Sequence, residues 1–160
     1  MTSSAKPSLG DPAILLATWF GAGCMRFAPG TWGSLAALPF AWGLTWAGGW
    51  PLLLAATVVV FLVGWWAASR YIAASGISDP GAVVIDEVAG QWLVLLLTPL
   101  DPVLYFIGFL LFRALDITKP WPARWADRDL HGGLGVMLDD VLAAGYGLLL
   151  MLALQQFWRG

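Results

Sequence analysis

Acidic side chains stand in adjacent pairs where apolar stretches of the chain begin. Asp86 and Glu87 open one apolar stretch, and Asp139 and Asp140 open another. Carboxylates held close together repel one another, so such a group needs a cation, and hard divalent ions prefer carboxylate oxygens. One pair alone would also fit an ordinary helix start, where the helix dipole favours negative charge. Two pairs in one short chain favour a metal site, with Asp116 as a further candidate acid.

Basic residues near these acids suit an anionic group. Arg113, Asp116 and Lys119 follow one another at intervals of three, so they share one side of a helix that Pro120 ends. Such a series can be an ordinary ladder of ion pairs. At the end of an apolar helix, however, arginine and lysine can also bind a phosphate. We therefore expect Arg113 and Lys119 to bind phosphate, while Asp116 binds a metal or orients the two bases.

Two glycine-rich segments are further candidates for the site. In the first, Gly30, Thr31, Gly33 and Ser34 are expected to form a loop before a helix. Free backbone N–H groups there could hold an anion, or Ser34 could simply cap the helix. The second segment carries His131, the single histidine, which is either a general acid or base or an exposed loop residue. The spacing leaves both alternatives open.

The composition is that of a membrane protein. Of 160 residues, 59% are hydrophobic and 11% charged, and the mean hydropathy is +0.76, far from a soluble average. A soluble helical domain with a large core is the alternative. The net charge of −2 argues against nucleic-acid binding, and the single cysteine, Cys24, excludes an internal disulfide. The length indicates one domain, residues 1–160, in which we expect the polar residues 1–10 to be disordered.

Glycine and proline divide the chain into short apolar segments, which predicts an all-α polytopic membrane bundle. The segments are 13–20, 35–47, 52–68, 86–112 and 141–157, with a tight turn at 48–51. Because Pro99 and Pro102 interrupt the stretch 86–112, we expect two short helices joined by a turn rather than one span. This hairpin returns the chain to the side it left, so Asp86, Arg113 and Asp139 are expected on one face.

Basic residues indicate which face this is. The turns at 48–51 and 99–102, on the opposite face, carry no lysine or arginine. Six basic residues fall on the proposed common face: Arg26, Arg70, Arg113, Lys119, Arg124 and Arg128. Because cytoplasmic segments are enriched in lysine and arginine, the polar site is predicted to face the cytoplasm. Arg159 is the exception to this pattern.

Four blocks of the sequence together resemble the phosphatidylglycerophosphatase A family of bacterial lipid phosphatases. They read APGTWGSL at 28–35, IDEVAG at 85–90, FRALDITKPWP at 112–122 and DRDLHGGLGVMLDD at 127–140. The likeness runs in order from residue 18 to 146, with one departure, a shift of the glycine after the second acidic pair to Gly145. The resemblance implies a magnesium-dependent enzyme that removes the terminal phosphate of phosphatidylglycerophosphate in the bacterial inner membrane, giving phosphatidylglycerol.

The residues and the resemblance together give a hypothesis for the site. The metal ligands would be Asp86, Glu87, Asp139 and Asp140, holding one or two Mg²⁺ ions that activate a water. Asp116 and His131 complete the catalytic candidates. The substrate phosphate would contact Gly30, Thr31, Gly33, Ser34, Arg113 and Lys119. The expected partners are a phospholipid substrate and the membrane, and the sequence does not indicate an oligomeric state.

Two other classes of membrane protein use acids at helix ends. A transporter or channel with an acidic ion site is the main competitor, although it would more often carry a charge at mid-span, and the stretches 52–68 and 141–157 have none. A lipid synthase that transfers an alcohol would require a different spacing of acids, which is absent. The enzyme hypothesis is therefore favoured over both.

Overall fold

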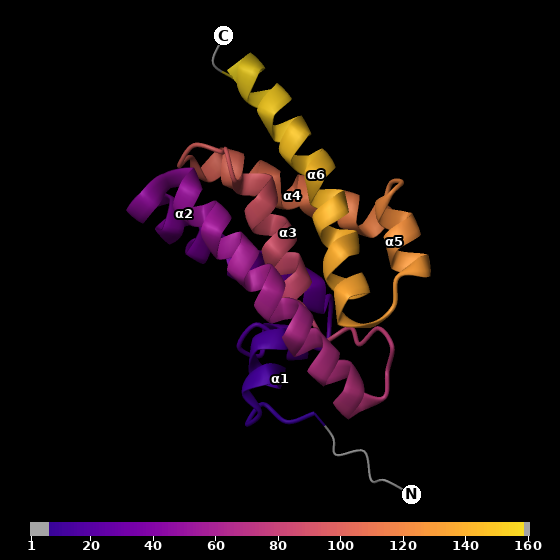
Figure 1. The fold of residues 1–160 in the computed structure, drawn as a ribbon. Coiled ribbons are helices and arrows are strands. Elements are labelled where there is room, and N and C mark those ends of the chain that lie inside the picture. Colours follow the sequence, from indigo (N-terminus) through magenta and orange to yellow (C-terminus); the bar gives the residue numbers. More distant parts are fainter. Residues whose placement is uncertain (1–6, 159–160) are drawn as a thin grey trace, which may run out of the picture.

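The computed structural model describes residues 7–158, and these residues form helices and connecting turns without a strand (Figure 1). The elements are α1 (Pro12–Ala17), the short 3-10 helix η1 (Ala22–Cys24), α2 (Pro29–Ser75), α3 (Ile85–Leu95), α4 (Pro102–Thr118), α5 (Ala123–Asp129) and α6 (Gly132–Trp158). The predicted all-α fold is confirmed. Of the segment expected to be disordered, residues 1–6 lie outside the described range. Residues 8–11 form a turn in which the Asp11 N–H donates to the Ser8 carbonyl at 2.9 Å.

The long helix α2 is two helices joined by a sharp turn. Gly49 has φ 67° and ψ −164°, a conformation that glycine adopts far more readily than other residues. Gly33 in the first half and Gly64 in the second half both pack against the segment 84–85. Because these glycines lie about equally far from the turn on either side, the chain must reverse there. The predicted turn at 48–51 is confirmed.

The helices α3 and α4 form the second hairpin. The turn between them ends at Asp101, whose side chain accepts hydrogen bonds from the Val103 and Leu104 N–H groups at 2.8 and 3.0 Å. Pro102 follows as the first helical residue, where its missing N–H costs nothing. With 11 residues, α3 is about 16 Å long and too short to cross a bilayer. The expected pair of short helices is therefore confirmed.

The last helix begins earlier than the sequence suggested. We expected Asp139 and Asp140 at its start, but α6 begins at Gly132, so both acids lie in its interior. Gly132 has a positive φ of 78° at the start of the helix, whereas Gly133 and Gly135 serve close packing. A Cβ at Gly133 would come within 2.6 Å of the Ser69 backbone nitrogen, and one at Gly135 within 2.6 Å of the Leu130 carbonyl carbon. The glycines predicted a loop, but at Gly133 and Gly135 the missing side chain allows close contact with neighbouring segments.

Two helices of the described chain, α2 and α6, are long and apolar enough to cross a membrane. Only 28% of the most apolar stretch of α2 and 39% of that of α6 is buried in the bundle. The exposed side chains on these helices include Val59, Leu62 and Leu149, each more than half exposed. An outward apolar surface of this extent is typical of helices in contact with lipid and not of a soluble core.

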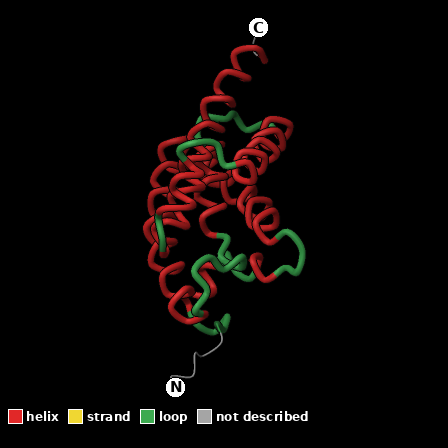
Figure 2. Tube along the Cα trace, turned by 90° about the vertical axis from the view of Figure 1, so that its right-hand side faces the viewer, coloured by secondary structure: helices red, strands yellow, loops and turns green. Residues whose placement is uncertain are grey.

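The helix ends that carry the predicted site residues lie at one end of the bundle. The first turns of α2, α3 and α6 and the last turn of α4 lie toward the same end of the bundle, whereas the two hairpin turns lie at the other end (Figures 1 and 2). Within the bundle, α3 packs against both α2 and α6. Gly90 permits the close approach of α4 and α6 to α3, because a Cβ there would lie 2.6 Å from the Phe112 ring and 3.3 Å from the Asp140 carbonyl oxygen. Arg159 lies outside the described residues.

Candidate active site

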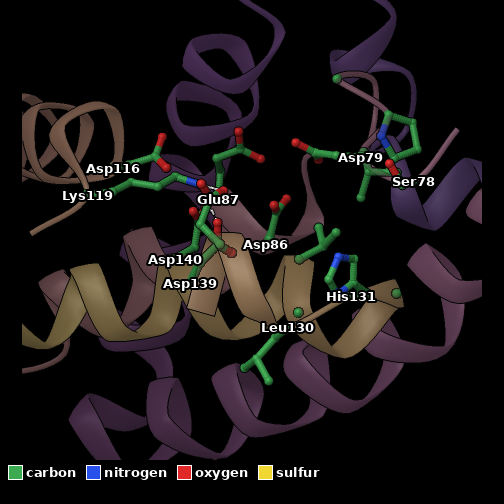
Figure 3. A pocket seen from close by; sticks show the side chains of 17 residues that line it. Ser78, Asp79, Asp86, Glu87, Asp116, Lys119, Leu130, His131, Asp139 and Asp140 are labelled. Carbon is green, nitrogen blue, oxygen red and sulfur yellow. Dashed lines mark hydrogen bonds and ion pairs between the residues drawn. The ribbon is translucent and has the colours of Figure 1, made fainter. Parts of the chain in front are cut away.

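A polar cavity of about 320 Å³ opens at the common end of the bundle (Figure 3). Its lining comes from α3, α4, α5, α6 and the loop between α2 and α3. The predicted site residues that line it are Asp86, Glu87, Asp116, Lys119, His131, Asp139 and Asp140. Segments more than 50 residues apart in the sequence therefore meet here, and the two acidic pairs share one cavity as expected.

Three carboxylates converge within this cavity. Asp86 and Glu87 lie in the first turn of α3, and Asp140 lies on α6. One carboxylate oxygen from each lies within 4.8 Å of the others, a spacing that fits coordination of one ion. Neither acidic pair caps its helix, because Val84 is the N-cap of α3 and Asp140 lies inside α6. The alternative of an ordinary helix start is therefore wrong for Asp139 and Asp140, whereas Asp86 and Glu87 do lie in the first turn of α3, where the helix dipole favours negative charge.

Four carboxylate oxygens, three in this cluster and one on the adjacent Asp139, are buried without a partner. They are Asp86 Oδ1, Glu87 Oε2, Asp139 Oδ1 and Asp140 Oδ2. Buried polar atoms are almost always paired in folded proteins, and an unpaired buried carboxylate is especially costly. Burial, and after it the neighbouring Glu87 carboxylate, raises the pKa of Asp86 well above its usual range. A divalent cation would satisfy these oxygens and remove their mutual repulsion.

Arg113 links three helices beside the acids. Its Nη1 lies 2.7 Å from Asp116 Oδ2, one turn further along α4, which confirms the ion pair expected from their spacing. The same nitrogen lies 3.7 Å from Glu87 Oε1 on α3 and donates to Ser34 Oγ on α2 at 3.4 Å. Only 14% of its side chain is exposed, so its charge is held at the site. Arg113 does not itself line the cavity but contacts Glu87 and Asp116, which do.

Lys119 reaches the other side of the cluster. It is the C-cap of α4 and has a positive φ of 42°, a strained conformation for a residue with a side chain. Its Nζ donates to Asp139 Oδ2 on α6 and to Asp127 Oδ1 on α5, the latter at 2.6 Å. Burial lowers the pKa of Lys119, but its hydrogen bonds to these two carboxylates outweigh burial and raise the pKa above its ordinary value. Asp139 therefore contacts a base, whereas Asp140 joins the acidic cluster.

The segment 30–34 is helical, which corrects the expected loop. Pro29 supplies a favourable first helical residue, so α2 starts before Gly30. Ser34 does not cap a helix; its Oγ donates to the Gly30 carbonyl at 2.9 Å. Gly33 packs against Val84, where a Cβ would lie 2.7 Å from the Val84 Cβ. Neither Thr31 nor the other three residues of this segment lines the cavity.

Gly30 nevertheless adjoins the site from behind. A Cβ at this position would overlap Glu87 Oε1 and would lie 3.1 Å from both Nη atoms of Arg113. Glycine is therefore required for the approach of α2 to the pair formed by Glu87 and Arg113. The sequence pointed to this residue for another reason, namely its free backbone N–H.

The rim of the cavity holds His131 and residues that the sequence analysis missed. His131 is exposed and lines the cavity, and Asp79 and Ser78 lie across from it (Figure 3). Asp127, the partner of Lys119, was also missed. Neither aspartate has a spacing to other site residues that predicts a contact, since each comes from a loop or a short helix. The only available signal was the gathering of most acids of this chain between residues 79 and 140.

Comparison with known proteins identifies the family of this chain. The family model of phosphatidylglycerophosphatase A matches residues 15–155. Phosphatidylglycerophosphatase A of Escherichia coli (strain K12) is 38% identical over 142 residues, covering 88% of this chain and 82% of the relative. That of Haemophilus influenzae (strain KW20 Rd) is 41% identical over 154 residues, covering 96% of this chain and 94% of the relative.

A third relative carries a different name. A protein of Bacteroides thetaiotaomicron, provisionally named a phosphatidylinositol-3-phosphatase, is 40% identical over 152 residues, covering 86% of this chain and 90% of the relative. No solved structure matches the chain at a significant level. The match of the family model to most of the chain and the identity to both phosphatidylglycerophosphatases support an enzyme over a transporter. The chain is a phosphatase and belongs to the phosphatidylglycerophosphatase A family.

Proposed function

We propose that this enzyme hydrolyses the terminal phosphate of phosphatidylglycerophosphate in a Mg²⁺-dependent reaction, giving phosphatidylglycerol and inorganic phosphate. The observation that carries the proposal is the cluster of Asp86, Glu87 and Asp140, whose oxygens lie within 4.8 Å of one another between Arg113 and Lys119. Acids for a cation and bases for a phosphate thus meet at the polar end of a membrane bundle. This is the combination that hydrolysis of a lipid phosphate requires.

The donor set suits Mg²⁺. Asp86, Glu87 and Asp140 offer only carboxylate oxygens, the ligand type that Mg²⁺ prefers, and three of these oxygens are buried without a partner. These three residues would hold the ion, and Asp139, with its own unpaired oxygen, lies beside them. When bound, the ion would polarise the phosphate and favour deprotonation of an attacking water.

The side chains of the chain then position and stabilise the phosphate. Arg113 is fixed by Asp116 and directs its guanidinium toward the acids, where it can neutralise charge that develops on the phosphate oxygens. Lys119 offers a second positive charge from the opposite side. In the reaction, the water oxygen bonds to phosphorus and the bond to the glycerol oxygen breaks. His131 at the rim can pass a proton between the cavity and solvent, so that the departing oxygen leaves as an alcohol.

The proposed location is the bacterial inner membrane, with the site facing the cytoplasm. The basic residues that favour this orientation include Arg70 near the end of α2 and Arg124 in α5, and both of these segments lie toward the same end of the bundle as the first turn of α6 (Figure 1). The exposed apolar faces of α2 and α6 agree with an enzyme that takes its substrate from the bilayer. Such a substrate presents its phosphate at the headgroup level, and the proposal sets the mouth of the cavity at that level.

The test is phosphate release by the purified enzyme in detergent micelles containing phosphatidylglycerophosphate, with Mg²⁺ or with EDTA. Phosphatidylinositol 3-phosphate is the comparison substrate, because one relative carries that name. We expect phosphate release from phosphatidylglycerophosphate that depends on Mg²⁺. No release of phosphate from phosphatidylglycerophosphate would contradict the proposed substrate. Equal release with EDTA and with Mg²⁺ would contradict the proposed cation.

A pair of variants ties the activity to the acidic cluster. Asp140→Asn removes one charge and one ligand oxygen, so we expect kcat to fall at least about 100-fold while the melting temperature of the protein is retained. Asp101→Asn is the matched control, since Asp101 caps α4 at the opposite end of the bundle and asparagine caps helices equally well. Equal activity in the two variants would remove Asp140 from the site.

A further inference from the structure

Gln91 is a polar side chain fully enclosed in the bundle beside the acidic cluster. It lies on α3, one helical turn after Glu87, and its exposed fraction is 0%. Neither its Nε2 nor its Oε1 has a hydrogen-bond partner. Each unmade hydrogen bond of a buried group costs about 1–3 kcal/mol, so such an amide is rarely left unpaired in a folded protein. Because an unpaired buried amide destabilises the fold, its presence at this position indicates a role in function.

The position of Gln91 directs it toward the site. Residues four apart on a helix share one face, and helical side chains lean toward the N-terminus of their helix. The Gln91 amide is therefore directed back toward the turn that carries Glu87. Glu87 Oε2, an acceptor, is itself buried and unpartnered. The unpaired Nε2–H donor of Gln91 therefore lies one helical turn from the unpaired Oε2 acceptor of Glu87.

The neighbouring atoms show which Glu87 oxygen remains for chemistry. Glu87 Oε1 lies 3.7 Å from Arg113 Nη1 and therefore faces this guanidinium. Gly30 lies on this same side, since a Cβ there would overlap Glu87 Oε1 and would lie 3.1 Å from both Nη atoms of Arg113. Arg113 and α2 thus confine Glu87 Oε1, whereas Glu87 Oε2 has no hydrogen-bond partner.

We propose that Gln91 is a positioning residue for Glu87. Its Nε2–H donates to Glu87 Oε2, after a small rotation of the side chain or through one buried water. This contact fixes the rotation of the Glu87 carboxylate beside Arg113, and Oε2 keeps a second lone pair for the cation. The inference rests on the proposed function, because it assigns Gln91 to the support of a proposed cation ligand. Such supporting contacts typically change metal affinity or activity by 10- to 100-fold when they are removed.

The test replaces Gln91 by methionine, which keeps the length of the side chain and removes both polar groups. Gln155→Met is the matched control, because Gln155 is a buried glutamine with an unpartnered Nε2. It lies 15 residues after Asp140 on α6, about 22 Å along the helix. The readout is the melting temperature of the purified protein in detergent as Mg²⁺ or Mn²⁺ is titrated, with kcat and KM measured in parallel.

We expect the Mg²⁺ concentration that gives half of the stabilisation to rise at least 10-fold in Gln91→Met and to stay unchanged in Gln155→Met. The kcat of Gln91→Met should fall while its KM for the lipid changes little. An unchanged cation midpoint and an unchanged kcat in Gln91→Met would overturn the proposal. If that variant fails to fold, Gln91→Asn, whose shorter amide cannot reach Glu87, must show the same loss.

The outcomes also separate this proposal from the proposed function. A wild-type protein whose melting temperature responds to no divalent cation would contradict the cation ligands. The role of Gln91 would then be judged by kcat alone, where a fall in Gln91→Met without a change in KM supports positioning of Glu87. A wild-type level of kcat in that case would overturn it.

Discussion

Replacing Gly30 by alanine is expected to impair catalysis while the fold is preserved. Gly30 lies in the first turn of α2, and a Cβ there would overlap Glu87 Oε1 and crowd both Nη atoms of Arg113. Since a carbon and an oxygen require about 3.3 Å, the carboxylate must move by about 1 Å. Displacements of this size at a reacting centre can lower the rate about 100-fold. We therefore expect kcat/KM for phosphatidylglycerophosphate to fall by about two orders of magnitude.

The fold should tolerate this change because the atoms displaced are the ends of flexible side chains. Alanine also favours a helix over glycine by up to about 1 kcal/mol, which offsets part of the strain. Gly43→Ala is the matched control, because Gly43 lies in the same helix and a Cβ there would meet nothing within 4 Å. The assays are phosphate release and thermal melting of both variants in the same detergent. Gly30→Ala with the activity of Gly43→Ala would refute the requirement for the observed geometry of Glu87 and Arg113.

Two further predictions concern the charges of the site. Lys119→Met leaves Asp139 buried without its cationic partner, so we expect a loss of about 3 kcal/mol in the free energy of unfolding together with a loss of activity. The exposed Arg128→Met serves as control, and equal unfolding curves for the two variants would contradict this expectation. Burial raises the pKa of Glu87 from 4.5 to about 7, so the folded protein binds this proton more tightly than the unfolded chain does. In EDTA the melting temperature should therefore fall as the pH rises from about 5 to about 7, and a flat profile would argue against a buried Glu87.

Much of the architecture could be predicted from local sequence because it depends on local rules. Gly49 and Pro51 mark one hairpin turn, and Asp101 and Pro102 mark the other, since each residue type restricts the backbone wherever it occurs. Once both turns are placed, the chain must return to one face, which brings Asp86 and Arg113 to the same end of the bundle. The start of α6 was misplaced because glycine has two uses. At Gly133 and Gly135 it permits close contact between segments rather than a turn.

The sequence alone determined the chemical character of the site, namely paired acids and two bases at the ends of apolar helices. Only the tertiary structure decided which side chains meet: Asp140 joins Asp86 and Glu87, whereas its neighbour Asp139 contacts Lys119. Adjacent residues on a helix point about 100° apart, so the packing of α6 against α3 and α4 assigns each acid its partner. The burial of the Gln91 amide was likewise decided by the tertiary structure, because it depends on the helices that surround α3.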